Sequence, residues 1–361
     1  MLKRVSIQNF KSLKDVTLDL QKVNLLIGPN NSGKTNFLKA LEYMVKENIN
    51  QSEPDFERIS FKQKLKSPIS ITLTFDRESS GLPYVRFSCL IKPDIIEKTV
   101  EDILRLNSVT LVSKSLNPLV LKVLTGPMTL YKPDPNKLTQ PGPVGKGEEM
   151  VKADASNLVG FLDLMLGKYR KAVFNRTEND LNKCVPEFDE INLDDAPSTE
   201  ELRKQYGDKS FKRLGLTNSK QGVTYWADEL SEGTLYFLAL LCIINQPNPP
   251  KLLLLEEPEK GIHPRRIQEV VNFILGLADE KDIQVIMTTH SPIVVDMFRD
   301  MPESVFIFDK DDEGATHVKN LQKNVIEPET EESERLGINP PQYLNGLGQA
   351  WKVGLIGGVP K

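Results

Sequence analysis

One stretch of eight residues restricts the fold more than any other part of the chain. Residues 28–35 read Gly-Pro-Asn-Asn-Ser-Gly-Lys-Thr, which matches G-x-x-x-x-G-K-[ST] in full. An apolar run at residues 23–27 predicts a strand before the loop, and the apolar spacing from Asn36 to about Val45 predicts a helix after it. A phosphate-binding loop needs this strand–loop–helix setting. A glycine-rich turn with a chance lysine is the alternative interpretation.

The residue types of this loop suit the phosphates of ATP bound with Mg²⁺. Glycines let the backbone approach closely, so the amides from Asn31 to Thr35 and the positive end of the helix can hold the β-phosphate. We expect Lys34 to neutralise the β- and γ-phosphates and the Thr35 hydroxyl to bind Mg²⁺. The predicted nucleotide-binding residues of the loop are Asn30, Asn31, Ser32, Gly33, Lys34, Thr35 and Asn36.

A second run, residues 251–257, has four leucines followed by Glu256 and Glu257. A buried parallel strand would deliver both carboxylates to the edge of the sheet where ligands bind. Because side chains alternate along a strand, we predict that the two carboxylates point in opposite directions. Glu256 would then hold the coordination shell of Mg²⁺ through a bound water. Glu257 would orient and deprotonate the attacking water. Two solvated carboxylates closing a core strand are the alternative.

The remaining pattern predicts an α/β fold: a largely parallel P-loop sheet, antiparallel N-terminal strands and an inserted helical lid. Helices and strands alternate after residue 230, and the segment from about 153 to 225 is polar and mainly helical in pattern. Residues 125–147 are rich in Pro, Gly and Lys and predict an exposed loop. The predicted parts are an N-terminal ATPase lobe (1–150), the lid (151–226), a C-terminal ATPase lobe (227–310) and a tail (311–361).

Several motifs together resemble the RecF/SMC/OLD-like branch of ABC-type ATPases. Residues 256–264, Glu-Glu-Pro-Glu-Lys-Gly-Ile-His-Pro, resemble its Walker B motif and D-loop, and residues 230–234, Leu-Ser-Glu-Gly-Thr, resemble its signature motif. Residues 288–291, Thr-Thr-His-Ser, resemble its switch histidine, and residues 7–12 are similar to its first hairpin. The resemblance covers residues 1–47 and 227–308 well and the middle loosely.

The resemblance implies a homodimer in which two heads sandwich two ATP molecules. Ser231 and Gly233 would grip the γ-phosphate held by the other subunit, and His290 would contact the γ-phosphate or the attacking water. Simple helix capping by Ser231 and a structural role for His290 are the alternatives. His263 is expected to serve packing or dimer contact, and His317 no catalytic purpose.

Two departures from the family pattern affect the site. Glu256 replaces the more usual aspartate, which predicts slow hydrolysis. The Q-loop glutamine has two candidates, Gln140 and Gln63.

Standalone ATPases of this branch are similar to the ATP-sensing subunits of bacterial anti-phage defence pairs. About 50 residues follow the last predicted strand, too few for a toprim nuclease domain. We therefore expect a separate effector, a nuclease or a toxin, bound through the lid or the tail. The tail from Tyr343 to Lys361 is expected to dock on the domain or on a partner. A DNA-repair ATPase and a catalytically weak ATP-binding scaffold that holds a toxic effector are the alternatives, and a transporter cassette fits less well.

Charge, cysteine content and apolar runs restrict the possible partners and the cellular compartment of the chain. A net charge of -4 gives no global attraction to nucleic acid. Two basic groups leave DNA open as a partner, although solvated faces explain them as well: Lys62, Lys64 and Lys66, and Lys168, Arg170 and Lys171. Cys89, Cys184 and Cys242 suggest neither a disulfide framework nor a zinc cluster. The chain has no membrane-length apolar run, so we expect a cytoplasmic protein.

Overall fold

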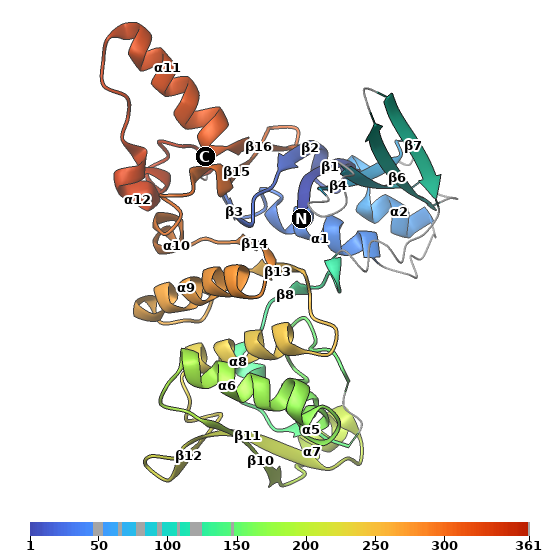
Figure 1. Ribbon diagram of the computed structural model, residues 1–361, viewed down its shortest axis with the longest axis vertical. Helices are drawn as coiled ribbons and strands as arrows, with labels where there is room; N and C mark the ends of the chain where they lie inside the picture. Colours follow the sequence, from blue (N-terminus) through green and yellow to red (C-terminus); the bar gives the residue numbers. More distant parts are fainter. Residues whose placement is uncertain are drawn as a thin grey trace. The chain divides into compact units, whose positions relative to one another are not determined.

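The computed structural model describes residues 1–45, 53–63, 67–76, 84–91, 96–106, 109–115, 125–145 and 148–359. The chain divides into two compact units (Figure 1). The first unit consists of Met1–Leu130, Lys251–Glu257 and Leu275–Lys361, and the second of Tyr131–Pro250 and Pro258–Ile274. Each unit is described by itself below.

The first unit contains the predicted P-loop sheet, with the strand order β16-β15-β3-β14-β13-β8. Strands β13, β14, β3 and β15 pair in parallel, and β16 runs antiparallel to β15. The bounds are β3 Val23–Ile27, β8 Leu130–Tyr131, β13 Leu252–Glu256, β14 Gln284–Thr288, β15 Val305–Lys310 and β16 Thr316–Asn320. The prediction of a largely parallel sheet is therefore confirmed.

The central strands are short apolar runs because both of their faces are covered. Every residue of β3 and β14 is buried. Helix α1 (Lys34–Val45) packs on this sheet with its apolar face, and Phe37 and Leu41 join one core with Leu254 and Ile286. The P-loop is thereby fixed at the carboxyl end of β3.

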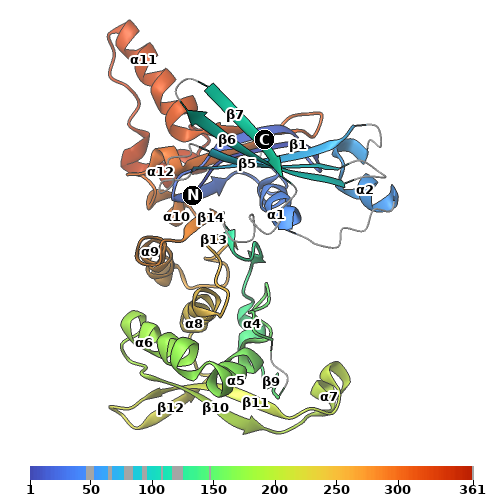
Figure 2. The ribbon, with the colours of Figure 1, turned by 45° about the vertical axis from the view of Figure 1, so that its right-hand side comes forward.

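The second sheet of this unit is antiparallel, in the order β2-β1-β4-β5-β6-β7. It confirms the predicted N-terminal strands, and Figure 2 shows it beside α1 and the short helix α2 (Glu53–Ile59), which is followed by η1 (Phe61–Gln63). Along β4 buried and half-buried residues alternate, as expected of a sheet with one face on the core. The bounds are β1 Leu2–Phe10, β2 Leu13–Asp19, β4 Ile69–Asp76, β5 Tyr84–Ile91, β6 Ile96–Leu106 and β7 Val109–Ser115.

The second unit contains the predicted lid, and it is more mixed than expected. Residues 158–184 are helical, but residues 190–226 include three strands in the order β10-β11-β12, with β9 also pairing β11. The sequence of these strands does not alternate between apolar and polar residues. In β10 only Ile191 is buried, and polar pairs such as Arg213–Asp194 face solvent. The bounds are α4 Pro135–Leu138, β9 Gly142–Pro143, α5 Leu158–Lys168, η2 Arg170–Phe174, α6 Asn175–Cys184, β10 Glu190–Ala196, α7 Glu200–Tyr206, β11 Phe211–Asn218, β12 Val223–Trp226 and α8 Glu232–Asn245. Helix α9 spans Pro264–Glu280, and its residues up to Ile274 belong to this unit.

The tail packs on its own unit, one of the two docking sites expected for it. Helix α12 (Leu347–Lys352) lies against α10 (Pro292–Asp296), and the Gly348 amide donates to Asp296 Oδ1 at 2.7 Å. A Cβ on Gly348 would lie 2.2 Å from the Pro292 carbonyl oxygen, so glycine permits this approach. The other elements of this part are η3 Pro302–Ser304, η4 Gln322–Ile326, α11 Glu327–Leu336 and η5 Tyr343–Gly346.

Within the described residues, no helix has the length and apolar character needed to cross a bilayer.

Candidate nucleotide-binding site

The P-loop follows a backbone path that its glycines make possible. Gly28 and Gly33 have φ angles of 143° and 110°, and Asn31 between them has a φ of 64°. A Cβ on Gly28 would lie 2.2 Å from the Phe308 carbonyl oxygen, and one on Gly33 would lie 2.2 Å from Thr316 Oγ1. Because both positions combine positive φ with a close neighbour, the first and last glycines of the motif are required by the fold of the loop.

Lys34 keeps its charged end over the loop. Its Nζ donates to the carbonyl oxygens of Gly28 at 2.7 Å and Pro29 at 2.9 Å, and the side chain is buried. Burial lowers the pKa of Lys34 to about 8, while the carboxylates of Glu257 and Glu256 act in the opposite direction by favouring the charged form. A negatively charged ligand at the loop would favour the ammonium in the same way.

Two residues outside the motif hold the loop in place. The Thr316 hydroxyl lies 2.8 Å from both the Ser32 carbonyl oxygen and the Ser12 hydroxyl, and Asn36 Nδ2 donates to Ser12 Oγ at 2.9 Å. Ser12 ends the hairpin segment that the sequence singled out, but its role was not foreseen. Thr316 starts β16, a strand that the sequence did not predict, so no local signal pointed to it.

The Ser32 hydroxyl is the best structural indication of an anionic ligand. It is fully buried, and among the described residues it has no hydrogen-bond partner. A buried donor without an acceptor costs about 1–3 kcal/mol. A phosphate oxygen in the loop would supply the acceptor, so the residues present fit the ligand that the motif predicts.

The end of β13 brings a carboxylate to the start of α1. Thr35 Oγ1 donates to Glu256 Oε1 at 2.6 Å, although the two residues are far apart in the chain. A hydroxyl and a carboxylate are oxygen ligands of the kind that Mg²⁺ prefers. The geometry therefore fits the predicted metal ligands, Thr35 and Glu256.

Glu257 does not continue the strand. Its φ of 48° is left-handed, and its amide donates to the Thr288 carbonyl oxygen at 3.2 Å. The alternation of side chains therefore ends at Glu256, and both carboxylates act electrostatically on Lys34. The prediction that they point in opposite directions assumed a regular strand through residue 257, and that assumption is wrong.

His290 lies beside Glu257 at the end of β14. Its Nε2 is 3.6 Å from Glu257 Oε1, and both side chains are partly exposed. The Thr289 amide donates to the Leu26 carbonyl oxygen at 3.2 Å, which ties this turn to the strand before the P-loop. The first unit thus brings together the loop, both carboxylates and the histidine that the sequence selected.

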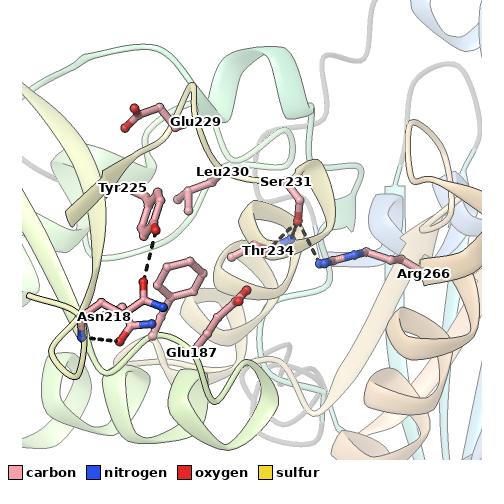
Figure 3. A pocket seen from close by; sticks show the side chains of 10 residues that line it. Glu187, Asn218, Tyr225, Glu229, Leu230, Ser231, Thr234 and Arg266 are labelled. Carbon is pink, nitrogen blue, oxygen red and sulfur yellow. Dashed lines mark hydrogen bonds between the residues drawn. The ribbon is translucent and has the colours of Figure 1, made fainter. Parts of the chain in front are cut away.

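The signature residues belong to the second unit. Ser231 caps α8, and its Oγ accepts from the Thr234 amide at 3.2 Å. Arg266 Nη1 also donates to Ser231 Oγ, at 3.1 Å (Figure 3). Gly233 is buried in the first turn of α8. Ser231, Thr234 and Arg266 border a pocket of about 280 Å³. Its lining residues are Glu187, Phe188, Asn218, Gln221, Tyr225, Glu229, Leu230, Ser231, Thr234 and Arg266.

The weaker candidates are two glutamines and two histidines. Exposed Gln140 is in the second unit and contacts Thr139 of its own turn, while Gln63 ends η1 in the first unit. His263 Nδ1 accepts from the Arg265 amide at 3.3 Å. His317 pairs with Asp311 at 2.8 Å on the surface.

One lysine of each predicted basic group has an acidic partner. Lys62 pairs with Glu313 at 3.3 Å, and Lys168 pairs with Glu149. Lys64 and Lys66 lie outside the described residues. DNA as a partner stays a prediction.

Comparison with known proteins decides the family. A family model described as an AAA ATPase domain matches residues 1–209, more than half of the chain. The chain belongs to this ATPase family. A second model, for an AAA domain associated with the AbiEii toxin of a type IV toxin–antitoxin system, matches residues 152–296.

Two curated relatives cover most of the chain. It is 23% identical to the OLD nuclease of Thermus scotoductus over 353 residues, 91% of this chain and 66% of the nuclease. It is 25% identical to an ATP/GTP phosphatase of Helicobacter pylori over 332 residues, 81% of this chain and 85% of that protein. The chain thus spans slightly less than two thirds of the nuclease.

A solved structure supports the fold. The SMC head domain of Pyrococcus yayanosii, with its coiled coil and joint, matches 92% of this chain and 99% of its own with a TM-score of 0.54 and 10% identity. The α/β head fold and the resemblance to the RecF/SMC/OLD branch are confirmed. The roles of the individual site residues stay predictions.

Proposed function

We propose that this ATPase is a nucleotide switch whose heads dimerise around MgATP and separate after hydrolysis. The contact of 2.6 Å between Thr35 and Glu256 carries the proposal, because it joins the P-loop to the carboxylate end of β13. The same unit places Glu257 next to His290 and within electrostatic reach of Lys34.

The chemistry follows from these groups. Lys34 and the loop amides bind the β- and γ-phosphates, and Ser32 supplies a further donor. When bound, Mg²⁺ would be held by Thr35 and Glu256 and would neutralise charge on the phosphates. Glu257 takes a proton from a water whose oxygen attacks the γ-phosphorus, the bond to the β-phosphate oxygen breaks, and ADP and phosphate leave. His290 orients that water from beside Glu257.

Dimerisation is the second part of the proposal. The hydroxyl of Ser231 and the N-terminus of α8, including Gly233, form a donor group suited to a γ-phosphate held by a second copy. Similarity to an SMC head supports the head fold, and the motif order supports the use of this donor group between subunits.

The variant Glu257→Gln tests the switch. It keeps the shape of the side chain and removes the base, so turnover should fall by about 10²- to 10⁴-fold while MgATP is still bound. Light scattering should show dimers that accumulate with MgATP. The surface variant Glu269→Gln on α9 is the control and should behave like the parent. Turnover of Glu257→Gln at the parental rate would exclude Glu257 as the base.

We further propose that the switch controls a separate effector, a nuclease or a toxin, in anti-phage defence. Similarity to a protein named OLD nuclease and to a domain associated with a toxin supports this setting. Purification from the native host under gentle conditions should recover the ATPase with its effector. Recovery of the protein alone, with ATP hydrolysis stimulated by DNA, would favour a DNA-repair ATPase instead.

Deleting α12 (Leu347–Lys352) would be a poor test of effector binding, because its removal would expose the core of the first unit. Leu336 and Ile338 are about 60% exposed and flank the end of α11, which projects from the first unit in Figure 1. Serine substitutions there should leave the fold intact. Loss of the effector from the purified complex would identify this end of α11 as its contact.

A further inference from the structure

Arg266, on the first turn of α9, directs its guanidinium at the signature serine (Figure 3). The distance from its Nη1 to Ser231 Oγ is 3.1 Å, and its Cδ lies 3.5 Å from where a Cβ of Gly233 would stand. The motifs read from the sequence give this arginine no role. Both contacts lie within one unit, so they belong to the folded subunit itself.

The hydrogen bonds of Ser231 leave one group for a ligand. A serine hydroxyl has two lone pairs and one hydrogen. The Thr234 amide at 3.2 Å occupies one lone pair, and Arg266 at 3.1 Å occupies the other. The hydrogen is then left for an acceptor: among the described residues Thr234 Oγ1 lies 2.8 Å away, and a ligand oxygen would take its place. With Arg266 in place, the hydroxyl meets an incoming group as a donor.

Two carboxylates line the same pocket, so an anion at Ser231 depends on a nearby positive charge. Glu187 and Glu229 also line it, and carboxylates repel an anion. Arg266 is the cation in the described lining and stands at the Ser231 end. A guanidinium stays charged over the whole physiological range and has further N–H groups to offer.

We propose that Arg266 is a positioning residue that holds Ser231 as a hydrogen-bond donor toward a phosphate oxygen of the nucleotide bound by a second copy of this chain. This inference rests on the proposed head dimer. It adds to that proposal the residue that orients the signature hydroxyl.

Three single variants test the role of Arg266: Arg266→Ala, Arg266→Lys and, as a matched control, Arg265→Ala at its exposed neighbour. Nucleotide binding is measured on dilute protein with a non-hydrolysable ATP analogue and Mg²⁺, and dimerisation by sedimentation at higher concentration. We expect Arg266→Ala to weaken the nucleotide-dependent dimer at least tenfold and to change binding by dilute protein less than twofold. Arg266→Lys keeps the charge but not the fork, so it should recover part of the loss.

A double-variant cycle with Ser231→Ala separates positioning from general structure. If Arg266 acts through the serine, the double variant dimerises no more weakly than Ser231→Ala alone. Additive losses, an unchanged dimer in Arg266→Ala, or an equal loss in Arg265→Ala would each overturn the inference. If Arg266→Ala folds poorly, Arg266→Lys takes its place in the test. The inference would be overturned if Arg266→Lys dimerised as well as the parent and adding Ser231→Ala to it caused no further loss. A parent that fails to dimerise with the analogue would refute the proposed head dimer, and the inference with it.

Discussion

At the scale of single residues, the buried cation of the P-loop links the fold to nucleotide binding. Lys34 is 5% exposed, and its charge is stabilised by two backbone carbonyls and by the field of two carboxylates. Such a side chain gives up part of its solvation in the folded protein, and an anionic ligand compensates for this loss.

Replacing Lys34 by alanine should weaken MgATP binding by about 10- to 100-fold, because charge-assisted hydrogen bonds to the phosphates are lost. The fold should persist, since the variant also removes a buried charge. Calorimetric titration measures the affinity, and circular dichroism serves as the check on folding. Unaltered affinity would refute the P-loop assignment.

Binding should also depend on pH. With a pKa of about 8, the ammonium of Lys34 is lost as the pH rises, so the affinity for ATP should fall by about tenfold between pH 7 and pH 9. The effect on stability has the opposite sign. Between pH 8 and 10.5 the unfolded chain binds more protons at this site than the folded one, so this contribution to stability rises with pH. Fluorescent-nucleotide titrations across this range measure the affinity, and Lys34→Arg, which stays charged, should remove the step.

At the scale of elements, the edge strand β16 supports the P-loop from outside the motif. Thr316 is buried, and its hydroxyl contacts both the Ser32 carbonyl and the Ser12 hydroxyl. The loop is therefore held between the first hairpin and the antiparallel edge strand of the P-loop sheet.

Replacing Thr316 by valine preserves the shape and removes the hydroxyl, which leaves two buried polar groups short of a partner. The free energy of unfolding should fall by about 1–3 kcal/mol, and ATP should bind more weakly. Denaturant titration measures the first and calorimetry the second. The control Thr316→Ser retains the hydroxyl and should keep most of the affinity; equal losses in both variants would point to packing instead.

At the scale of the whole molecule, each unit carries part of the predicted machinery. The P-loop, both carboxylates and His290 lie in the first unit, and the signature serine and Arg266 lie in the second. The tail completes the first unit, because Trp351 is 7% exposed and its Nε1 donates to the Gly358 carbonyl oxygen at 2.9 Å.

Replacing Trp351 by alanine should therefore destabilise the first unit. Removing a buried tryptophan costs about 3–5 kcal/mol, which corresponds to a drop of about 10 °C in melting temperature. Differential scanning fluorimetry tests this. Leu355→Ala in the same tail is the control, because Leu355 is 60% exposed and should change the melting temperature little. Similar melting temperatures for the two variants would show that the tail does not stabilise the unit.

The features that depend on short stretches of chain could be predicted from the amino-acid sequence. A complete phosphate-loop motif between an apolar strand and a helix, a leucine run ending in two glutamates, and a serine before an apolar helix fixed the parallel sheet, α1 and the cap of α8. Features that depend on contacts between distant segments became visible in the three-dimensional fold. The left-handed turn at Glu257, the Thr316 support and the Arg266–Ser231 contact each join segments that no short pattern connects. The strands at residues 190–226 were missed for the related reason that their pairing, not their own polar sequence, makes them strands.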